Sequence, residues 1–242
     1  MKNKLEISKE IRRNIVKMVY TAKSGHPGGS LSAVEILVSL YFGEMNIDPA
    51  EPDKEERDHF VLSKGHITPA YYSVLAERGY FPKEELSTFR QMDSRLQGHP
   101  CMQHCPGIDM TTGSLGQGVS CAVGMALSAK LRDRNYRVYT LLGDGELEEG
   151  QVWEACMFAG HRKLDNLTII IDNNNLRGYS LKNYSGNDTD TAAKRMGAKG
   201  CILNVGKVNT EGLNFNNSAV ARGVDFYDNY KFDIGASISK IE

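Results

Sequence analysis

The sequence lacks any long apolar run. No window approaches the roughly 18 apolar residues that a membrane-spanning helix requires. Residues 1 to 10 alternate charges and carry no apolar core of the length of a secretory signal. These absences predict a protein with no membrane span and no secretory signal, and we expect it to be cytoplasmic.

The chain also lacks an excess of charge of either sign. Its 29 Lys and Arg residues against 30 Asp and Glu residues give a formal net charge of −1, with the two signs interspersed. Domains that bind nucleic acid usually gather positive charge on one face or stripe. A nucleic-acid partner is therefore not expected, and small-molecule chemistry is the favoured class of function.

Cysteine is scarce and irregularly placed. The five cysteines are odd in number and scattered, which predicts reduced core or loop residues and no disulfide framework. Cys101 and Cys105 lie near His99 and His104, so a metal site is an alternative interpretation of this region. The first reading is favoured because this spacing lacks the second ligand pair of a zinc finger.

Glycine, in contrast, is abundant. Many of the 24 glycines adjoin Asp, His or Ser, and glycine allows a backbone to approach a ligand closely. This pattern favours a binding site over a purely structural role. A length of 242 residues with 40% apolar content is enough for one large domain with a sizeable core.

Helical and extended patterns alternate along most of the chain. Helical spacing is found at residues 11 to 19, 31 to 41, 119 to 127 and 149 to 162, and Thr68 with Pro69 resembles an N-cap and first turn. Apolar strands are expected at residues 60 to 62, 137 to 142, 167 to 171 and 201 to 205. Buried strands alternating with helices predict an α/β fold, a parallel sheet covered by helices on both faces. Residues 1–176 are expected to form the domain core, and residues 177–242 a diverged C-terminal part of the same domain.

Polar triplets follow two of the predicted strands. A Gly-Asp-Gly triplet centred on Asp144 ends one strand, and an Asp-Asn-Asn triplet ending at Asn174 ends the next. Carboxyl ends of neighbouring parallel strands emerge side by side, so Asp144 and Asn174 are expected to share one ligand. Carboxylate, amide and carbonyl oxygens suit Mg2+. Taken singly, either triplet would be read as a plain turn or loop.

The paired triplets resemble the thiamine diphosphate motif, and their context is similar to transketolase. The resemblance covers residues 8 to 176 almost without a gap. The matching stretches are SGHPGGSLSAVEIL, FVLSKGHITPAYYSVLAERGYF, SRLQGHP, TTGSLGQG and LLGDGELEEGQVWEACMFAGHRKLDNLTIIIDNN. The chain is similar to the N-terminal member of transketolases split into two polypeptides. This implies transfer of a two-carbon ketol unit between ketose and aldose phosphates, with thiamine diphosphate and Mg2+.

The resemblance also implies roles for individual residues. Asp144, Asn174 and the backbone carbonyl of Leu176 would bind Mg2+. The residues that would contact thiamine diphosphate are His66, Gly113, Ser114, Leu115, Gly145 and Asn174. The catalytic residues would be His26, His66 and His99, of which His26 and His99 would line the sugar channel. Glu149 would belong to a carboxylate network that couples two active sites across a dimer.

A partner polypeptide is a further implication. In the family, a glutamate on a separate pyrimidine-binding domain activates the cofactor, and the 242 residues have no room for that domain. We therefore expect the partner to be a C-terminal transketolase subunit, the substrates to be sugar phosphates, and the assembly to be a homodimer or heterotetramer.

The tail departs from the family. Transketolases carry a Lys-Trp-His-Gly segment, whereas here Asp233 or Ile234 stands near the place of its histidine. A carboxylate at this place would repel a phosphorylated sugar. Two alternatives therefore stay open: a non-catalytic paralogue that binds cofactor or partner, and a relative that acts on a different or unphosphorylated sugar.

Overall fold

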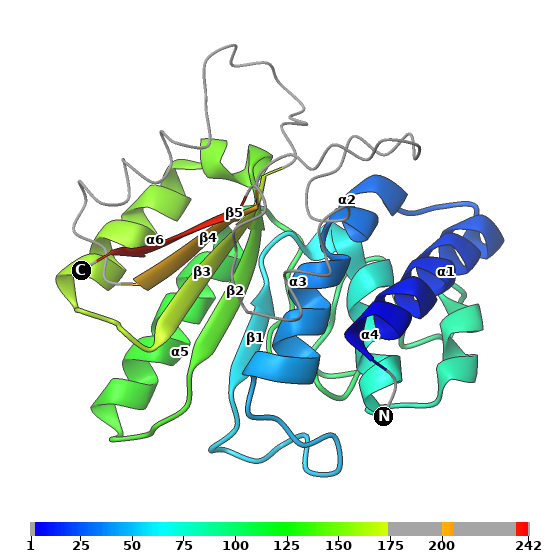
Figure 1. The fold of residues 1–242 in the computed structure, drawn as a ribbon, viewed down its shortest axis with the longest axis horizontal. Helices are drawn as coiled ribbons and strands as arrows, with labels where there is room; N and C mark the ends of the chain where they lie inside the picture. The colour runs from blue at the N-terminus through cyan, green and yellow to red at the C-terminus, as the bar shows by residue number, and fades with distance from the viewer. Residues whose placement is uncertain (1–2, 174–199, 206–235, 242) are drawn as a thin grey trace.

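A five-stranded sheet in the order β1-β2-β3-β4-β5 runs through the fold (Figure 1). The strands are β1 (His59–Leu62), β2 (Val138–Gly143), β3 (Leu167–Asp172), β4 (Gly200–Val205) and β5 (Ala236–Ile241). Strands β1 to β4 are parallel and β5 pairs antiparallel with β4. The computed structural model describes residues 3–173, 200–205 and 236–241, the last two ranges by their backbone.

Helices cover both faces of this sheet (Figure 1). One face carries α1 (Lys4–Ala22), α2 (Pro27–Ser32), α3 (Val34–Ser39) and α4 (Thr68–Arg78), and the other carries α5 (Gln117–Leu131) and α6 (Gly150–His161). Successive strand residues point to opposite faces, so Phe60 and Leu62 join the first core cluster and Val61 the second. The predicted α/β fold, a parallel sheet with helices on both faces, is confirmed. None of the described helices is long and apolar enough to cross a membrane.

Helix α1 illustrates how the sequence specifies these elements. The Asn3 side chain accepts a hydrogen bond from the Glu6 N–H at 2.8 Å and so caps the helix. Ile11 and Ile15, one turn apart, are fully buried in the first core cluster, and burying such a side chain stabilises the fold by about 1.5–3 kcal/mol. The helix ends where Lys23 adopts a left-handed conformation.

The structure differs from the sequence prediction at three places. The single helix expected over residues 31 to 41 is broken at Ala33 into α2 and α3, and the Ser32 hydroxyl at this break binds the Asp172 carboxylate. Thr68 is not an N-cap, because its Oγ1 donates to the Gly98 carbonyl at 3.1 Å and the helix already begins at Thr68. Strand β5 was not predicted, whereas the expected strand at residues 201 to 205 is confirmed as β4.

The described cysteines agree with the prediction of reduced thiols. Among residues 3–173, all of them are free; they are Cys101, Cys105, Cys121 and Cys156. Burial raises the pKa of the Cys105 and Cys156 thiols to about 12. Since the thiolate is the reactive form, these two side chains serve as small apolar core residues.

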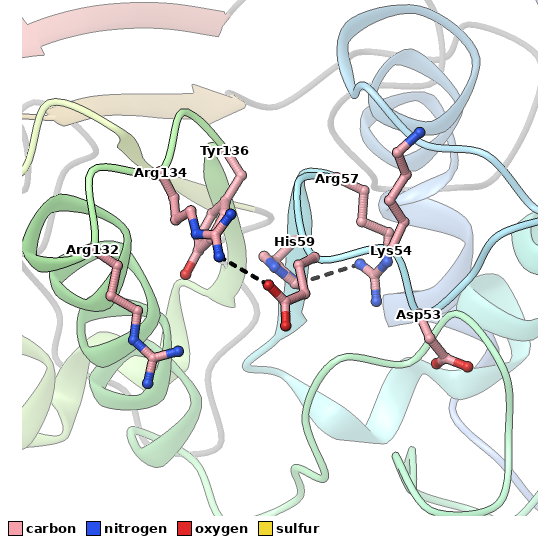
Figure 2. Close-up of a pocket in the computed structure, with 8 residues that line it drawn as sticks. Asp53, Lys54, Arg57, His59, Arg132, Arg134 and Tyr136 are labelled. Carbon is pink, nitrogen blue, oxygen red and sulfur yellow. Dashed lines mark hydrogen bonds and ion pairs between the residues drawn. The ribbon is translucent and has the colours of Figure 1, made fainter.

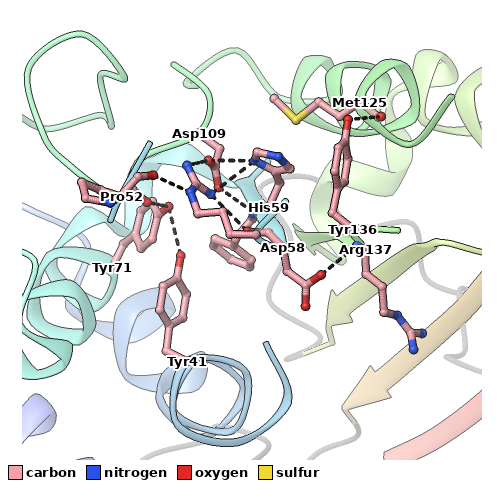
Figure 3. Close-up of polar contacts among 12 residues, drawn as sticks. Tyr41, Pro52, Asp58, His59, Tyr71, Asp109, Met125, Tyr136 and Arg137 are labelled. Carbon is pink, nitrogen blue, oxygen red and sulfur yellow. Dashed lines mark hydrogen bonds and ion pairs between the residues drawn. The ribbon is translucent and has the colours of Figure 1, made fainter. Parts of the chain in front are cut away.

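A buried polar cluster lies at the amino-terminal end of β1 (Figure 3). The Asp109 carboxylate accepts hydrogen bonds from Arg57 Nη2 at 2.5 Å, from His59 Nδ1 at 3.0 Å and from the Phe60 N–H at 2.7 Å. Burial alone would raise the pKa of Asp109, but the hydrogen bonds from His59 and Arg57 outweigh it and lower that pKa. The cluster fastens the start of the sheet to the loop that carries Asp109.

A pocket of about 230 Å³ adjoins this cluster (Figure 2). It is lined by Asp53, Lys54, Glu55, Arg57, His59, Arg132, Arg134 and Tyr136. Two of its arginines are neutralised by carboxylates: Arg134 pairs with Glu55 at 3.0 Å and with Glu56, and Arg57 pairs with Asp109. The polar contacts of this pocket therefore connect the amino-terminal end of the sheet to its flanking loops.

Two glycines of α5 differ sharply in the space around them. A Cβ on Gly118 would lie 2.6 Å from the Ser63 Cα, whereas a Cβ on Gly124 meets nothing within 4 Å. We expect Gly118→Ala to lower the free energy of unfolding by about 1–3 kcal/mol because backbone must move. Gly124→Ala should raise it by up to about 1 kcal/mol, since alanine favours a helix. Urea unfolding curves of both variants test this, and equal changes in the two would contradict the packing.

Candidate functional site

The carboxyl ends of β1, β2 and β3 bring three loops together. The Lys64 N–H, just after β1, donates to the Leu141 carbonyl of β2 at 3.1 Å. The Asp144 N–H, just after β2, donates to the Asp172 carbonyl at the end of β3 at 3.2 Å. The predicted adjacency of the strands before the two triplets is confirmed by the pairing of Gly143 with Asp172. Asn174 and Leu176 lie outside the described residues, so the shared ligand of Asp144 and Asn174 stays a prediction.

A buried ion pair underlies these loops. Lys64 Nζ lies 2.7 Å from Asp172 Oδ2, and the two side chains are 3% and 0% exposed. The Ser32 hydroxyl binds the same carboxylate oxygen. Among the described residues, the buried Oδ1 of Asp172 has no hydrogen-bond partner.

Glu146 is a second buried carboxylate at this edge. It accepts hydrogen bonds from the Ser63 hydroxyl at 2.5 Å, the Gly116 N–H at 2.8 Å and the Gly143 N–H at 3.2 Å. Burial raises the pKa of Glu146, although these three hydrogen bonds act in the opposite direction. One side chain thereby connects the end of β1, the end of β2 and the start of α5.

Three histidines gather beside the same edge. The rings of His26 and His66 meet edge to face, with centroids 5.1 Å apart. A Cβ on Gly113 would lie 3.1 Å from Cδ2 of His99, so this ring rests against the loop before α5. Burial, then the charge of Lys64, lowers the pKa of His66 to about 4. Burial, then the charge of Arg90, also lowers the pKa of His26, so both imidazoles are neutral at pH 7.

The loop before α5 is pressed against the end of β1. A Cβ on Gly65 would lie 2.7 Å from Thr112 Oγ1 and 2.9 Å from the Gly113 nitrogen. The Thr112 hydroxyl in turn donates to the Leu62 carbonyl at 2.6 Å. Ser114 and Leu115, which follow Gly113, are exposed. The structure thus places Gly113, the first residue of the predicted cofactor segment 113 to 115, beside the short helix η2 (Gly65–Ile67), which carries His66.

The remaining predicted residues follow β2. Asp144 is 4% exposed, Gly145 begins the short helix η4 (Gly145–Glu148) and Glu149 stands at the N-cap of α6. A Cβ on Gly116 would lie 3.0 Å from the Cβ of Glu149, which places Glu149 next to the loop before α5. The structure therefore gathers every described residue of the predicted site at one edge of the sheet.

Of the three groups predicted to bind Mg2+, only the Asp144 carboxylate belongs to the described residues. Asp144 supplies a carboxylate, a hard oxygen donor of the kind that Mg2+ prefers. Within the described part of the chain, no three His, Cys, Asp or Glu side chains form a metal-ion site. This disfavours the alternative site at Cys101 and Cys105.

Roles for Lys64, Ser32 and Glu146 were not predicted from the sequence, and Asp172 was noted only as the first residue of the Asp-Asn-Asn triplet. Asp172 ends a buried apolar strand and Lys64 lies two residues after another, at the edge where parallel sheets bind ligands. That position is the signal that would have indicated them. Ser32 and Glu146 have no comparable signal, because their roles depend on contacts made 140 and 83 residues away in the sequence.

Known proteins share this sequence and fold. The family described as the thiamine diphosphate binding domain of transketolase matches residues 3–219. A 6-deoxy-6-sulfo-D-fructose transketolase subunit from a Clostridium species is 40% identical over 238 residues, which cover 87% of this chain and 86% of that protein. An apulose-4-phosphate transketolase subunit from Actinobacillus succinogenes is 47% identical over 171 residues, covering 70% of this chain and 62% of that protein.

Undivided relatives match only in part. Human transketolase is 45% identical over 172 residues, which cover 71% of this chain and 27% of that protein. The crystal structure of transketolase from Campylobacter jejuni superposes with a TM-score of 0.75 at 35% identity, covering 81% of this chain and 33% of that one. The chain therefore spans most of the Clostridium subunit and about a third or less of these two undivided proteins.

Proposed function

Because the chain belongs to the transketolase family, as its thiamine diphosphate binding domain, we propose that it is the N-terminal subunit of a transketolase. In this proposal it transfers a two-carbon ketol unit from a ketose phosphate to an aldose phosphate, together with a C-terminal partner subunit. The supporting observation is that His66 stacks edge to face on His26 and directly follows Gly65, which packs against Gly113, while the His99 ring rests on Gly113, at the edge that carries Asp144.

The proposed cofactors are thiamine diphosphate and Mg2+. Asp144, Asn174 and the carbonyl of Leu176 would hold Mg2+. The residues that would contact thiamine diphosphate are His66, Gly113, Ser114, Leu115, Gly145 and Asn174. Bound thiamine diphosphate supplies a carbanion centre at its thiazolium ring. We assign residues 1–176 to the core of the domain and residues 177–242 to the rest of the same domain.

Neutral histidines suit the binding of sugar hydroxyls. A neutral imidazole has one nitrogen that donates and one that accepts, so it can bind a hydroxyl in either direction or move a proton between oxygens. The lowered pKa values of His26 and His66 keep both rings in this form near neutral pH. We propose that His26 and His99 line the sugar channel and that His66 lies between this channel and the cofactor.

The proposed partner carries the pyrimidine-binding domain. Two relatives are named as transketolase subunits, which supports a C-terminal subunit that completes the cofactor pocket. A homodimer or heterotetramer is the proposed assembly, with Glu149 at the start of α6 in the network between two sites. One of these relatives is named for a sulfonated sugar and the other for a sugar phosphate, which supports an anionic sugar as substrate. We expect this assembly in the cytoplasm.

Dependence on a partner is the test of this proposal. We expect the purified chain to show no ketol transfer from a ketose phosphate, because in this proposal the glutamate that activates the cofactor belongs to the partner subunit. Addition of the cognate C-terminal subunit should restore transfer, followed by the appearance of the aldose and ketose products with thiamine diphosphate and Mg2+ present. Turnover by the chain alone would refute the divided enzyme.

A second outcome would favour the alternative function. A complex that binds thiamine diphosphate yet transfers no ketol unit would indicate a non-catalytic paralogue. This is the second candidate function because Asp233 or Ile234 stands near the place of the expected histidine. Asp233 and Ile234 lie outside the described residues. Transfer from free ketose at a rate equal to that from ketose phosphate would instead indicate an unphosphorylated substrate.

A further inference from the structure

The ion pair between Lys64 and Asp172 lies under the proposed site and contributes little as a stabilising device. Both charges are almost fully removed from water. A buried pair gains from Coulomb attraction about what it loses by desolvation, so apolar residues of equal volume would often stabilise a fold as well. The position of this ion pair under the proposed site therefore explains its presence better than a contribution to stability does.

Lys64 connects the ends of three strands. Its backbone N–H, two residues after the end of β1, donates to the Leu141 carbonyl of β2 at 3.1 Å. Its ammonium group lies 2.7 Å from the Asp172 carboxylate at the end of β3. Ser32, at the break between α2 and α3, holds the same carboxylate. The residue thus fixes β3 relative to β1 and ties both to the helices of the first face.

Asp172 in turn positions Asp144, the proposed metal ligand. Its backbone carbonyl accepts the Asp144 N–H at 3.2 Å, and its β3 position is paired with Gly143. Asp172 also directly precedes the segment that leads to Asn174. A side chain that holds Asp172 therefore holds the start of both loops proposed to carry Mg2+ ligands.

The ammonium group of Lys64 also lies beside the histidines. A Cβ on Gly29 would be 3.9 Å from Lys64 Nζ and 3.7 Å from His66 Nε2, so both groups approach the same point on α2. The charge of Lys64 contributes to the low pKa values of His66 and His26. The same buried ammonium group therefore binds Asp172, next to the proposed metal ligands, and acts electrostatically on His66 and His26.

We propose that Lys64, assisted by Ser32, is a positioning residue that aligns the Asp144 loop with the His66 loop by binding the Asp172 carboxylate. This inference rests on the proposed function, because the alignment concerns a metal ligand and a histidine of the same active site. Lys64 is buried and acts through Asp172 and His66. A cationic side chain that reaches the Asp172 carboxylate is required.

Hydrogen exchange of the full chain without cofactor tests the alignment directly. In Lys64→Met, the amide of Asp144 should exchange about tenfold faster than in the wild type, because its acceptor carbonyl is no longer fixed. The amide of Val138, bonded to the Asn166 carbonyl at 2.9 Å at the opposite edge of the sheet, should keep its wild-type rate. Lys64→Arg should restore slow exchange at Asp144, and Ser32→Ala should accelerate it less than Lys64→Met.

Arg57→Met is the matched control. It removes the cation of another buried pair, whose side chains are 11% and 4% exposed, at the amino-terminal end of β1. It should destabilise the fold without selectively accelerating exchange at Asp144. If Lys64→Met and Arg57→Met accelerate all amides alike, or if the Asp144 amide keeps its wild-type rate in Lys64→Met, the positioning role is refuted. If Lys64→Met does not fold, the exchange rate of the Asp144 amide is compared in Ser32→Ala and Lys64→Arg instead. Wild-type exchange in Ser32→Ala would then refute the positioning role.

The pKa of His66 provides a second readout, measured by NMR titration of the same samples. The charged and titratable groups that act on His66 are Lys64, His26, His99 and Asp172. Removal of the Lys64 charge should raise the pKa of His66 from about 4 toward its ordinary value, and Lys64→Arg should keep it low. An unchanged pKa of His66 in Lys64→Met would contradict an electrostatic effect of Lys64 on His66. Neither readout uses ketol transfer, so a failure of the proposed function would leave both results intact.

Discussion

Asp144→Ala should abolish the binding of thiamine diphosphate with Mg2+ to the complex assembled with the C-terminal subunit. The diphosphate would lose the cation that neutralises it, since Mg2+ requires oxygen ligands at fixed positions. Loss of a supporting group around a metal already costs about 10–100-fold in affinity, so loss of a ligand should weaken binding by roughly 100-fold or more. Titration calorimetry of the assembled complex measures this affinity.

Two control variants separate the ligand role from general damage. Asp144→Asn keeps the volume and one oxygen donor but loses the charge, so its affinity should fall between those of wild type and Asp144→Ala. Asp53→Ala removes an exposed carboxylate from the pocket at the opposite edge of the sheet and should leave the affinity unchanged. Wild-type affinity in Asp144→Ala would mean that the cofactor is bound elsewhere.

The strands and the predicted site edge could be derived from the sequence because their signals are local. The apolar runs at residues 137 to 142 and 167 to 171 are long enough to indicate buried parallel strands, and both are confirmed as β2 and β3. The placement of Asp144 at the end of one strand follows from these runs alone. His66, after β1, comes to the same edge because parallel strands end together.

Features that depend on distant contacts were not accessible in this way. The helix break at Ala33 is accompanied by a bond between Ser32 and Asp172, which lie 140 residues apart, whereas the apolar spacing is compatible with one continuous helix. Thr68 has the composition of an N-cap, yet its hydroxyl is taken by the Gly98 carbonyl. In both cases a tertiary hydrogen bond overrides the local preference of a small polar residue.

The buried charges were the hardest features to foresee. Lysine and glutamate are rarely fully buried, so Lys64 and Glu146 would be placed at the surface by composition alone. Only the paired strands bring Lys64 to Asp172 and only the loop before α5 brings the Gly116 N–H to Glu146. Strand β5 is a different case, since the alternation of Ser237, Ile238 and Ser239 is a strand signal that the polar surroundings obscured.

At the other end of the sheet, Asp109→Ala should lower the free energy of unfolding by about 3–5 kcal/mol, because it leaves a buried cation without its partner. The Arg57 guanidinium would remain largely buried, and the Phe60 N–H would lose its acceptor. Urea unfolding of the chain measures the loss. In contrast to Asp144→Ala, the folded complex should retain wild-type affinity for thiamine diphosphate, since this carboxylate lies at the start of β1 and the proposed site at its end.

The pH dependence of stability provides a control for the role of the Asp109 charge. Its pKa is lowered in the folded chain, so its contribution to stability is present above the unfolded value of about 3.9 and is lost as the pH falls through the lower folded value. Asp109→Asn cannot ionise and should therefore be less stable than the wild type at pH 7, by a difference that shrinks as the pH falls below about 4. A difference that stayed constant down to acid pH would show that the carboxylate charge contributes nothing. Loss of cofactor affinity in Asp109→Ala without loss of stability would contradict the separation of the two ends of the sheet.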